Sequence, residues 1–234
     1  MRPIFLAALL LCAASCSSCV IAIGPGASDG VHSGSFWSGI RGSGVAKTES
    51  RTVSEFHGIR IEGVCDVVAT VGGEQSVSLT ADDNLLEYVT TEVEDGVLVI
   101  SMRDGTNARF RVAPTARIQV KALDQLSIEG SGDGDVTGIA SESFTAGIDG
   151  SGDLCLRGKT TRLAFSINGS GDADLSGLQS VDADVSINGS GDVRLHCTGR
   201  LTAAISGSGD VSYSGSPKST HFSKSGSGSI HSVD

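Results

Sequence analysis

A four-residue motif, Gly-Ser-Gly-Asp, recurs through the second half of the chain at nearly constant spacing. Its exact copies end at Asp133, Asp153, Asp172, Asp192 and Asp210. Successive aspartates are 20, 19, 20 and 18 residues apart, and a degenerate copy follows at Gly226–Ser229. A fixed period in this range is the sequence signature of a solenoid, in which each repeat forms one coil that stacks on the next.

On both sides of each motif, apolar residues occupy every second position, and smaller or more polar residues lie between them. Leu163, Phe165 and Ile167 precede one copy at steps of two, and Ala173 and Leu175 follow it. This period indicates half-buried strands on either side of a corner. A second corner is predicted where another small residue recurs, at Gly138, Gly158, Gly177, Cys197 and Gly215. Glycine suits such corners because it tolerates positive φ and close backbone approach.

The predicted fold class follows from this unit. Each coil consists of a strand, the Gly-Ser-Gly-Asp corner, a second strand and a second corner. Equivalent strands then stack in parallel, and parallel crossovers are nearly always right-handed. We therefore expect an all-β fold, a right-handed parallel β-helix wound as a single-stranded solenoid from units of about 19–20 residues.

The beginning of the chain predicts export. Arg2 supplies a positive charge, residues 4–11 are apolar, and this run is too short to span a bilayer. Small residues then lead to Cys16, in a pattern that resembles a bacterial lipobox. The resemblance implies a signal peptide over residues 1–15, lipid on Cys16 and, from Ser17, attachment to the outer membrane. Cleavage before Cys19 and an ordinary secretory signal are the alternatives.

The remaining chain divides into two parts. Residues 16–50 include a Gly/Ser-rich stretch with little periodicity and are predicted to form a flexible tether. Residues 51–234 are predicted to form the solenoid, with Gly63–Val67 as a decayed corner motif. Within this part, Cys65, Cys155 and Cys197 cannot all pair with one another, and their pairing stays open.

Several short sequences carry a family resemblance that covers residues 50–230. They are Arg51-x-Val53-x-x-Phe56-x-x-Ile59, Asn84–Leu86, Gly96–Ile100 and two copies of Ser-Ile-Asn-Gly-Ser-Gly-Asp. Together they resemble the auto-transporter adhesin "head GIN domain" family. The resemblance implies a bacterial, exported and often lipidated protein with a right-handed parallel β-helix and a role in adhesion. It supplies no catalytic residues.

The motif aspartates are predicted to form a ladder along one edge of the solenoid. The ladder consists of Asp133, Asp153, Asp172, Asp192 and Asp210. Carboxylates about 5 Å apart repel one another unless they face backbone N–H groups, solvent or a cation. Capping of the corners is one interpretation. A row of weak Ca²⁺ sites is the other, although Ca²⁺ takes about 6–8 oxygen ligands and each coil supplies one carboxylate.

A second row of polar residues lies just before the motif. Asp149, Asn168, Asn188 and Ser206 occupy equivalent outward positions in successive coils. Side chains stacked in this way are predicted to form a ladder that supports the coils. The same row is the predicted binding face for a glycan.

The function predicted from these features is non-catalytic binding. The net charge of −10 argues against a nucleic-acid partner, because phosphates require cations. The nearly uniform units leave no room for long catalytic loops. We expect a cell-envelope lipoprotein, periplasmic or cell-surface facing, that needs no cofactor and binds a glycan or an envelope protein. The alternatives are a purely structural or stress-related envelope component and a divergent polysaccharide-active enzyme.

Overall fold

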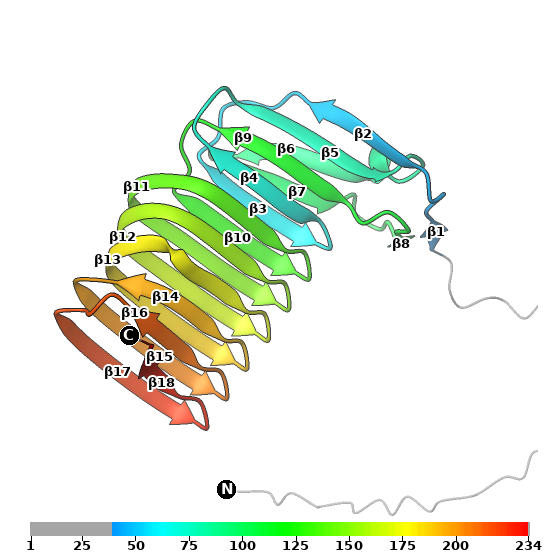
Figure 1. Cartoon of the computed structure of the whole chain (residues 1–234). Helices are drawn as coiled ribbons and strands as arrows, with labels where there is room; N and C mark the ends of the chain where they lie inside the picture. Colours follow the sequence, from blue (N-terminus) through cyan, green and yellow to red (C-terminus); the bar gives the residue numbers. More distant parts are fainter. Residues whose placement is uncertain (1–38, 234) are drawn as a thin grey trace, which may run out of the picture. The chain divides into compact units, whose positions relative to one another are not determined.

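The computed structural model describes residues 39–233, and these residues form a right-handed parallel β-helix of about five turns (Figure 1). The predicted fold class is confirmed. The predicted signal peptide, Cys16 and Cys19 lie outside the described residues. Within residues 39–233, no helix has the length and apolar character that crossing a bilayer would require.

The repeat coils, residues 125–232, are built from strands that run up to the Gly-Ser-Gly-Asp corner and strands that follow it. In chain order they are β10 (Gln125–Gly130), β11 (Gly134–Gly150), β12 (Leu154–Gly169), β13 (Ala173–Gly189), β14 (Val193–Cys197), β15 (Arg200–Gly207), β16 (Val211–Ser214), β17 (Ser219–Gly226) and β18 (Ile230–Ser232). We call the two flat sides of the solenoid the pre-corner face and the post-corner face. Strands β11, β12 and β13 run through the second corner without a break and belong to both faces.

The core is a set of stacked apolar side chains between these faces. Ile128, Ile148, Ile167, Ile187 and Ile205 are aligned in parallel register on five successive coils. Each is at most 2% exposed. Full burial of such a side chain contributes about 1.5–3 kcal/mol, so the repeated stack is a main source of stability. The apolar residues predicted at every second position of the strands are therefore the ones that are buried.

The two glycines of each corner are needed for different reasons. The first glycine has positive φ, as at Gly169 with 143°. The second has no such requirement, but it lies against the preceding coil. A Cβ added to Gly171 would lie 2.0 Å from the carbonyl oxygen of Gly152. Both conditions recur from coil to coil because equivalent corners stack directly on one another.

The N-terminal part, residues 46–120, begins the same solenoid with less regular strands. Strands β3 (Gly58–Gly63) and β4 (Asp66–Val71) form a first coil whose Gly63 aligns with Gly130. Strand β3 also pairs with β7 (Val97–Met102), and β4 also pairs with β9 (Thr115–Val120). The decayed motif at residues 63–67 is thus a true corner.

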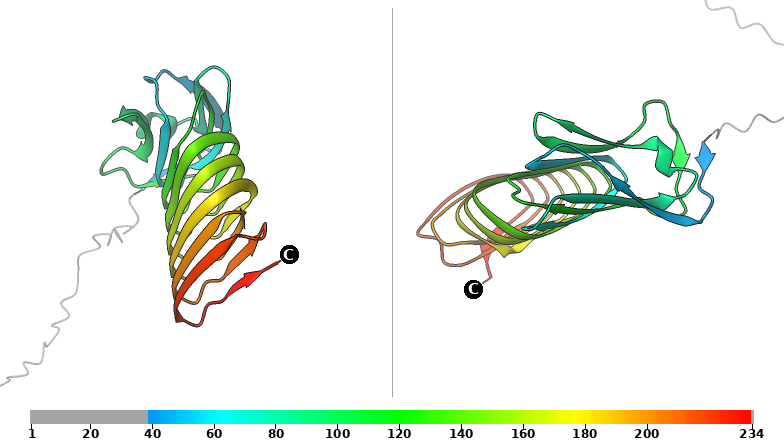
Figure 2. Two further views of the ribbon diagram at one scale, coloured as in Figure 1. Left: turned by 90° about the vertical axis from the view of Figure 1, so that its left-hand side faces the viewer. Right: turned by 90° about the horizontal axis from the view of Figure 1, so that it is seen from above.

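Antiparallel strands complete this N-terminal part (Figure 2). On one face β6 (Val89–Glu94) pairs with β7, and on the other β5 (Ser76–Asp82) pairs with β9 and β2 (Ala46–Arg51). A short 3₁₀ helix, η1 (Leu86–Tyr88), lies between β5 and β6.

Strand β1 (Ile40–Arg41) pairs with β8 (Ala108–Arg109) in a separate small sheet. Strands β1 and β2 begin within residues 16–50, the segment predicted to be a tether. The folded part therefore starts before residue 51. The partners of these strands lie far along the chain, so no local pattern marks them.

Candidate binding surfaces of the solenoid

The motif aspartates form a continuous hydrogen-bonded ladder along the first corner. In each coil the backbone N–H of the aspartate donates to Oδ1 of the aspartate in the preceding coil, at 2.8–3.0 Å. The ladder begins at Asp66 and ends at Ser229, whose N–H donates to Oδ1 of Asp210 at 2.7 Å. The bonds therefore run between coils and not within one corner.

This geometry explains how a row of carboxylates is tolerated. Each Oδ1 accepts a backbone N–H from the next coil, so these oxygens face donors and not one another. At the end of the row, the Ser229 hydroxyl and then its N–H lower the pKa of Asp210. In the described part of the chain, no group of three or more His, Cys, Asp or Glu side chains is placed to hold a metal ion. The hydrogen bonds of the ladder link successive corners.

Sequence reasoning missed the two ends of the ladder. Asp66 follows Gly63 by three residues, the same offset as in the exact motifs, and this spacing was the available signal. Ser229 replaces aspartate in the degenerate copy and closes the ladder as a donor.

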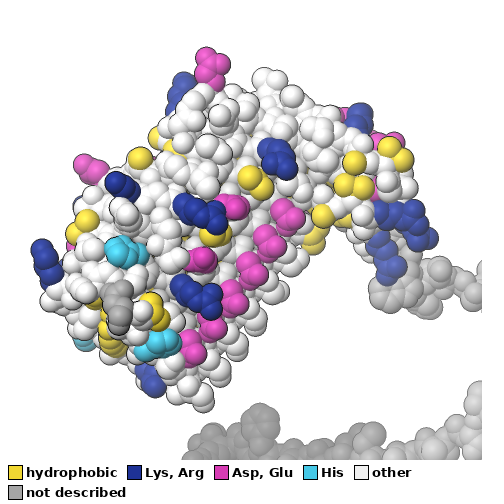
Figure 3. All heavy atoms as spheres, viewed as in Figure 1, with side chains coloured by type: hydrophobic (Ala, Val, Ile, Leu, Met, Phe, Trp, Pro, Cys, Tyr) yellow, Lys and Arg dark blue, Asp and Glu magenta, His cyan; other side chains and the backbone are white. Residues whose placement is uncertain are grey.

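A shallow groove lies beside the ladder on the post-corner face. Asp135, Cys155, Asp174 and Arg194 are aligned on four successive coils along it. Arg157 Nη1 lies 2.7 Å from Asp135 Oδ1. A straight row of acidic side chains follows this face, with Arg or Lys side chains beside it (Figure 3). The groove therefore carries mixed charge.

The cysteines of the described residues are free thiols. Cys65 and Cys197 are buried, and Cys155 is half-buried and faces outward. Burial raises the pKa of Cys65 to about 12, and burial also raises the pKa of Cys155. Burial likewise raises the pKa of Cys197, so all three thiols stay protonated near neutral pH.

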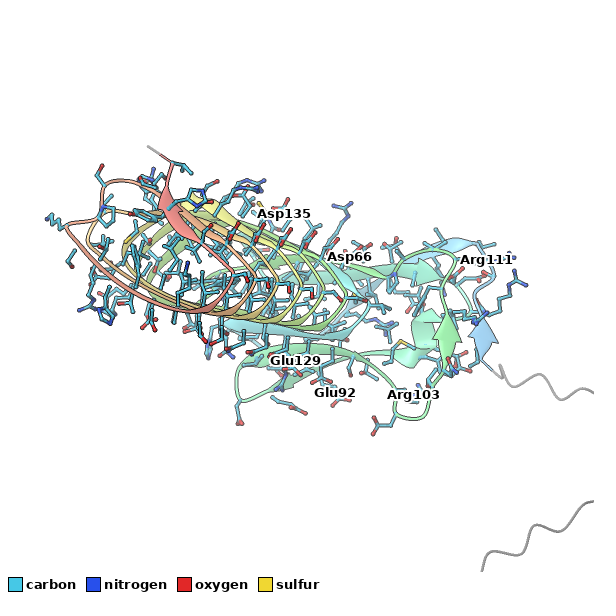
Figure 4. All side chains as sticks on the ribbon, turned by 90° about the horizontal axis from the view of Figure 1, so that it is seen from below. Asp66, Glu92, Arg103, Arg111, Glu129 and Asp135 are labelled. Atoms are coloured by element: carbon cyan, nitrogen blue, oxygen red, sulfur yellow. The ribbon has the colours of Figure 1, made fainter. Side chains whose placement is uncertain are left out.

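The predicted binding face lies on the opposite side of the solenoid. Figure 4 places Glu129 and Glu92 on this side and Asp66 and Asp135 on the other. Asn168 Nδ2 donates to Asp149 Oδ1 at 2.6 Å, and Asn188 Nδ2 donates to Asn168 Oδ1 at 3.1 Å.

Register continues this row to Ser206 at one end and to Glu129 at the other. The structure thus brings Asp149, Asn168, Asn188 and Ser206 into one exposed row, as the sequence predicted. That this row binds a ligand stays a prediction.

A third surface, which sequence reasoning missed, is a groove over the second corner with a volume of about 720 Å³. We call it the second-corner groove. It is lined by Ala140, Ser141, Glu142, Lys159, Thr160, Thr161, Gln179, Ser180, Val181, His196 and Thr198. Cys197 was predicted at the place of the corner glycines, but it lies opposite Ser180 instead. The fourth coil is shorter than its neighbours, and this shifts its register.

Comparison with known proteins gives a family and a fold. The sequence profile of a family described as "Putative auto-transporter adhesin, head GIN domain" matches residues 55–217. No curated protein matches the chain.

Three solved structures are similar over 83% of this chain. A "putative adhesin" from Bacteroides fragilis is 24% identical, with a TM-score of 0.70 and all of its chain covered. A "putative adhesin" from Parabacteroides distasonis is 22% identical, with a TM-score of 0.54 and 99% of its chain covered. A "putative lipid binding protein" from the same species is 26% identical, with a TM-score of 0.50 and 99% of its chain covered.

Proposed function

The chain belongs to the head GIN domain family of auto-transporter adhesins, and from this premise we propose that it is a non-catalytic cell-envelope protein that binds a glycan or a protein partner. The binding surface that we propose is the pre-corner face around Asn168 and Asn188. The family's description as adhesins supports an exported or surface-exposed protein. Lipid on Cys16 would hold it at the outer membrane.

The observation that carries this proposal is the ordered polar row on a flat surface. The side chains of Asp149, Asn168 and Asn188 are exposed and already hydrogen-bonded to one another. Ordering side chains on binding costs about 0.5–1.5 kcal/mol for each one, so a row that is ordered beforehand loses less. Small residues beside the row, such as Gly147 and Ser166, keep the surface flat.

The contacts of the histidines support a non-catalytic role. His196 Nδ1 lies 3.0 Å from the Ser214 hydroxyl, and His231 Nε2 lies 3.2 Å from the Ser212 hydroxyl. A serine nucleophile also requires a third group that orients the histidine. Among the described residues, neither of these imidazoles has a hydrogen bond to a carboxylate. The two pairs are therefore better explained as contacts between coils.

A binding experiment tests the proposed face. The chain from residue 16, with Cys16→Ser to prevent lipidation, is applied to a glycan array and to immobilised envelope proteins. We expect Asn168→Ala with Asn188→Ala to weaken the strongest interaction about tenfold, as expected for about 1.4 kcal/mol. Arg194→Ala on the post-corner face is the control and should have no effect. Equal binding by both variants would contradict this face as the site.

The lipid anchor has its own test. Cells grown with a labelled fatty acid should incorporate the label into the unaltered protein and into Cys19→Ser, but not into Cys16→Ser. Loss of label in Cys19→Ser alone would place the anchor on Cys19. No label in the unaltered protein would favour an ordinary secretory signal.

A further inference from the structure

The second-corner groove crosses four successive coils. Ala140, Lys159, Gln179 and His196 are aligned in register along it, one from each coil. Equivalent strands are about 4.8 Å apart, so the groove offers a polar or small side chain at regular steps along the solenoid axis. Its lining residues come from the corner where β11, β12 and β13 turn between the two faces, and Figure 1 shows the course of these strands.

The floor of the groove is polar and fixed. Thr160 is 5% exposed and Ser180 is 2% exposed. The Ser141 hydroxyl donates to Thr160 Oγ1 at 3.3 Å, and the Ser180 hydroxyl donates to the His196 carbonyl at 2.6 Å. These side chains lie on paired strands and not on a loop, so the floor is held rigidly.

The rim carries polar groups that have no partner among the described residues. Within residues 39–233, no hydrogen bond or ion pair involves the side chains of Glu142, Lys159 or Gln179. Together they offer donors and acceptors whose charges cancel. Val181 is 47% exposed beside them and gives the groove an apolar contact. The rim is therefore suited to a ligand with both hydroxyl and C–H surfaces.

The backbone pairing excludes one class of ligand. Strands β12 and β13 have hydrogen-bonded neighbours on both sides, so an extended peptide cannot add to them as a further strand. One lysine is also too little charge for a polyanion. A ligand read by side chains alone, neutral and rich in hydroxyl groups, fits these conditions best.

We propose that the second-corner groove binds a neutral oligosaccharide along the solenoid axis, with Lys159 and Gln179 donating hydrogen bonds to its hydroxyl groups. The exposed methyl groups of Val181 would contact the C–H face of a sugar ring. This inference rests on the proposed binding function, but it names the ligand class and a different surface of the same solenoid.

The test compares the two surfaces with defined probes. Neutral β-linked hexasaccharides of glucose, mannose and N-acetylglucosamine are titrated calorimetrically into the Cys16→Ser chain that begins at residue 16. For the hexasaccharide that binds best, we expect Lys159→Ala with Gln179→Ala to raise the Kd about tenfold. The exposed Lys218→Ala, outside both surfaces, is the control and should change it less than about twofold. Asn168→Ala with Asn188→Ala, on the pre-corner face, is titrated in the same way. Melting temperatures verify that each variant folds.

Each other outcome has a defined meaning. If the pre-corner variant loses hexasaccharide binding and the groove variant does not, the groove proposal is overturned and the proposed function stands. If no neutral hexasaccharide binds, the groove proposal is also overturned. The proposed function then stands only if the pre-corner face binds another glycan or an envelope protein in the experiment above.

Discussion

The repeat coils and the N-terminal part solve the same folding problem by different means. Between β10 and β18 every strand pair is parallel, and each Gly-Ser-Gly-Asp corner repeats the one before it (Figure 1). In the N-terminal part, antiparallel strands cover the two faces, β6 on one and β5 with β2 on the other. Further coils could add to an open stack of parallel strands. The antiparallel strands at the N-terminal end of the solenoid terminate the stack there.

The other end of the solenoid stops in a simpler way. Lys224 on β17 aligns with the buried Ile205 of the preceding coil. A charge at an inward position of an edge strand opposes the addition of another strand. The two ends show that terminating a repeat takes residues that break its pattern.

The N-terminal part also depends on a single buried carboxylate. Asp82 is 0% exposed. It accepts the N–H of Gly44 at 2.6 Å, the N–H of Arg111 at 2.8 Å and the N–H of Val112 at 3.1 Å. The ladder contacts of the repeat thus have equivalents in neighbouring coils, whereas one carboxylate holds three N–H groups of the N-terminal part.

The largest expected effect comes from placing a side chain inside the repeated corner. In Gly171→Ala the new Cβ meets the Gly152 carbonyl oxygen at 2.0 Å and Ile148 Cγ2 at 3.1 Å. Neither can move without disturbing the stack, so we expect a loss of about 3 kcal/mol in the free energy of unfolding, measured in urea.

A matched substitution outside the corner motif serves as the control. At Gly177 an added Cβ meets Arg157 Cγ at 2.9 Å, which belongs to a flexible side chain. Gly177→Ala should therefore cost less than about 1 kcal/mol. Similar losses in both variants would show that the corner contact is not the cause.

The second effect in size tests the N-terminal part. Burial opposes ionisation of Asp82, but its three N–H donors outweigh burial and hold its pKa below the ordinary value of 3.8. Because the folded pKa is the lower one, the carboxylate stabilises the fold above pH 3.8, and this contribution is lost as the pH falls through the folded pKa. Asp82→Asn should thus lower the melting temperature at neutral pH.

The pH dependence of this effect shows whether Asp82→Asn acts by removing the negative charge or by disturbing the packing. The difference in melting temperature between the unaltered protein and Asp82→Asn should shrink as the pH falls below 3.8. The exposed Asp104→Asn is the control and should leave the melting curve unchanged at each pH. A difference that stays constant across the range would mean that the amide disturbs packing and that the charge has little effect.

The difference between the repeat coils and the N-terminal part also explains how much of the structure could be predicted from the sequence alone. The coils, the stacked isoleucines and the aspartate ladder were predictable because each position is confirmed by its equivalents in other coils. The contact between Gly44 and Asp82 has no equivalent, and its partners are 38 residues apart. The second-corner groove was hidden for a related reason, since it forms where coils of slightly different length meet.

Removing one carboxylate of the aspartate ladder should have a smaller effect on the free energy of unfolding. Asp172 Oδ1 accepts the Asp192 N–H at 2.8 Å. Asp172→Ala leaves that donor to solvent and should cost about 1 kcal/mol in urea unfolding. Asp172→Asn keeps an acceptor oxygen and should be close to neutral. If the asparagine variant is as unstable as the alanine variant, the charge is essential.

A calorimetric response to Ca²⁺ that only the unaltered protein gives would then support a cation role.

The smallest effect is expected on the pre-corner face. Asn168 is exposed, donates to Asp149 and accepts from Asn188. Water can replace both partners, so Asn168→Ala should change the free energy of unfolding by less than about 0.5 kcal/mol, and Ser206→Ala on the same row should match it. A loss as large as that of Asp172→Ala would make the row a structural support. A negligible loss, together with weakened binding, would mean that folding does not require the asparagines, which leaves ligand recognition as the reason for their alignment.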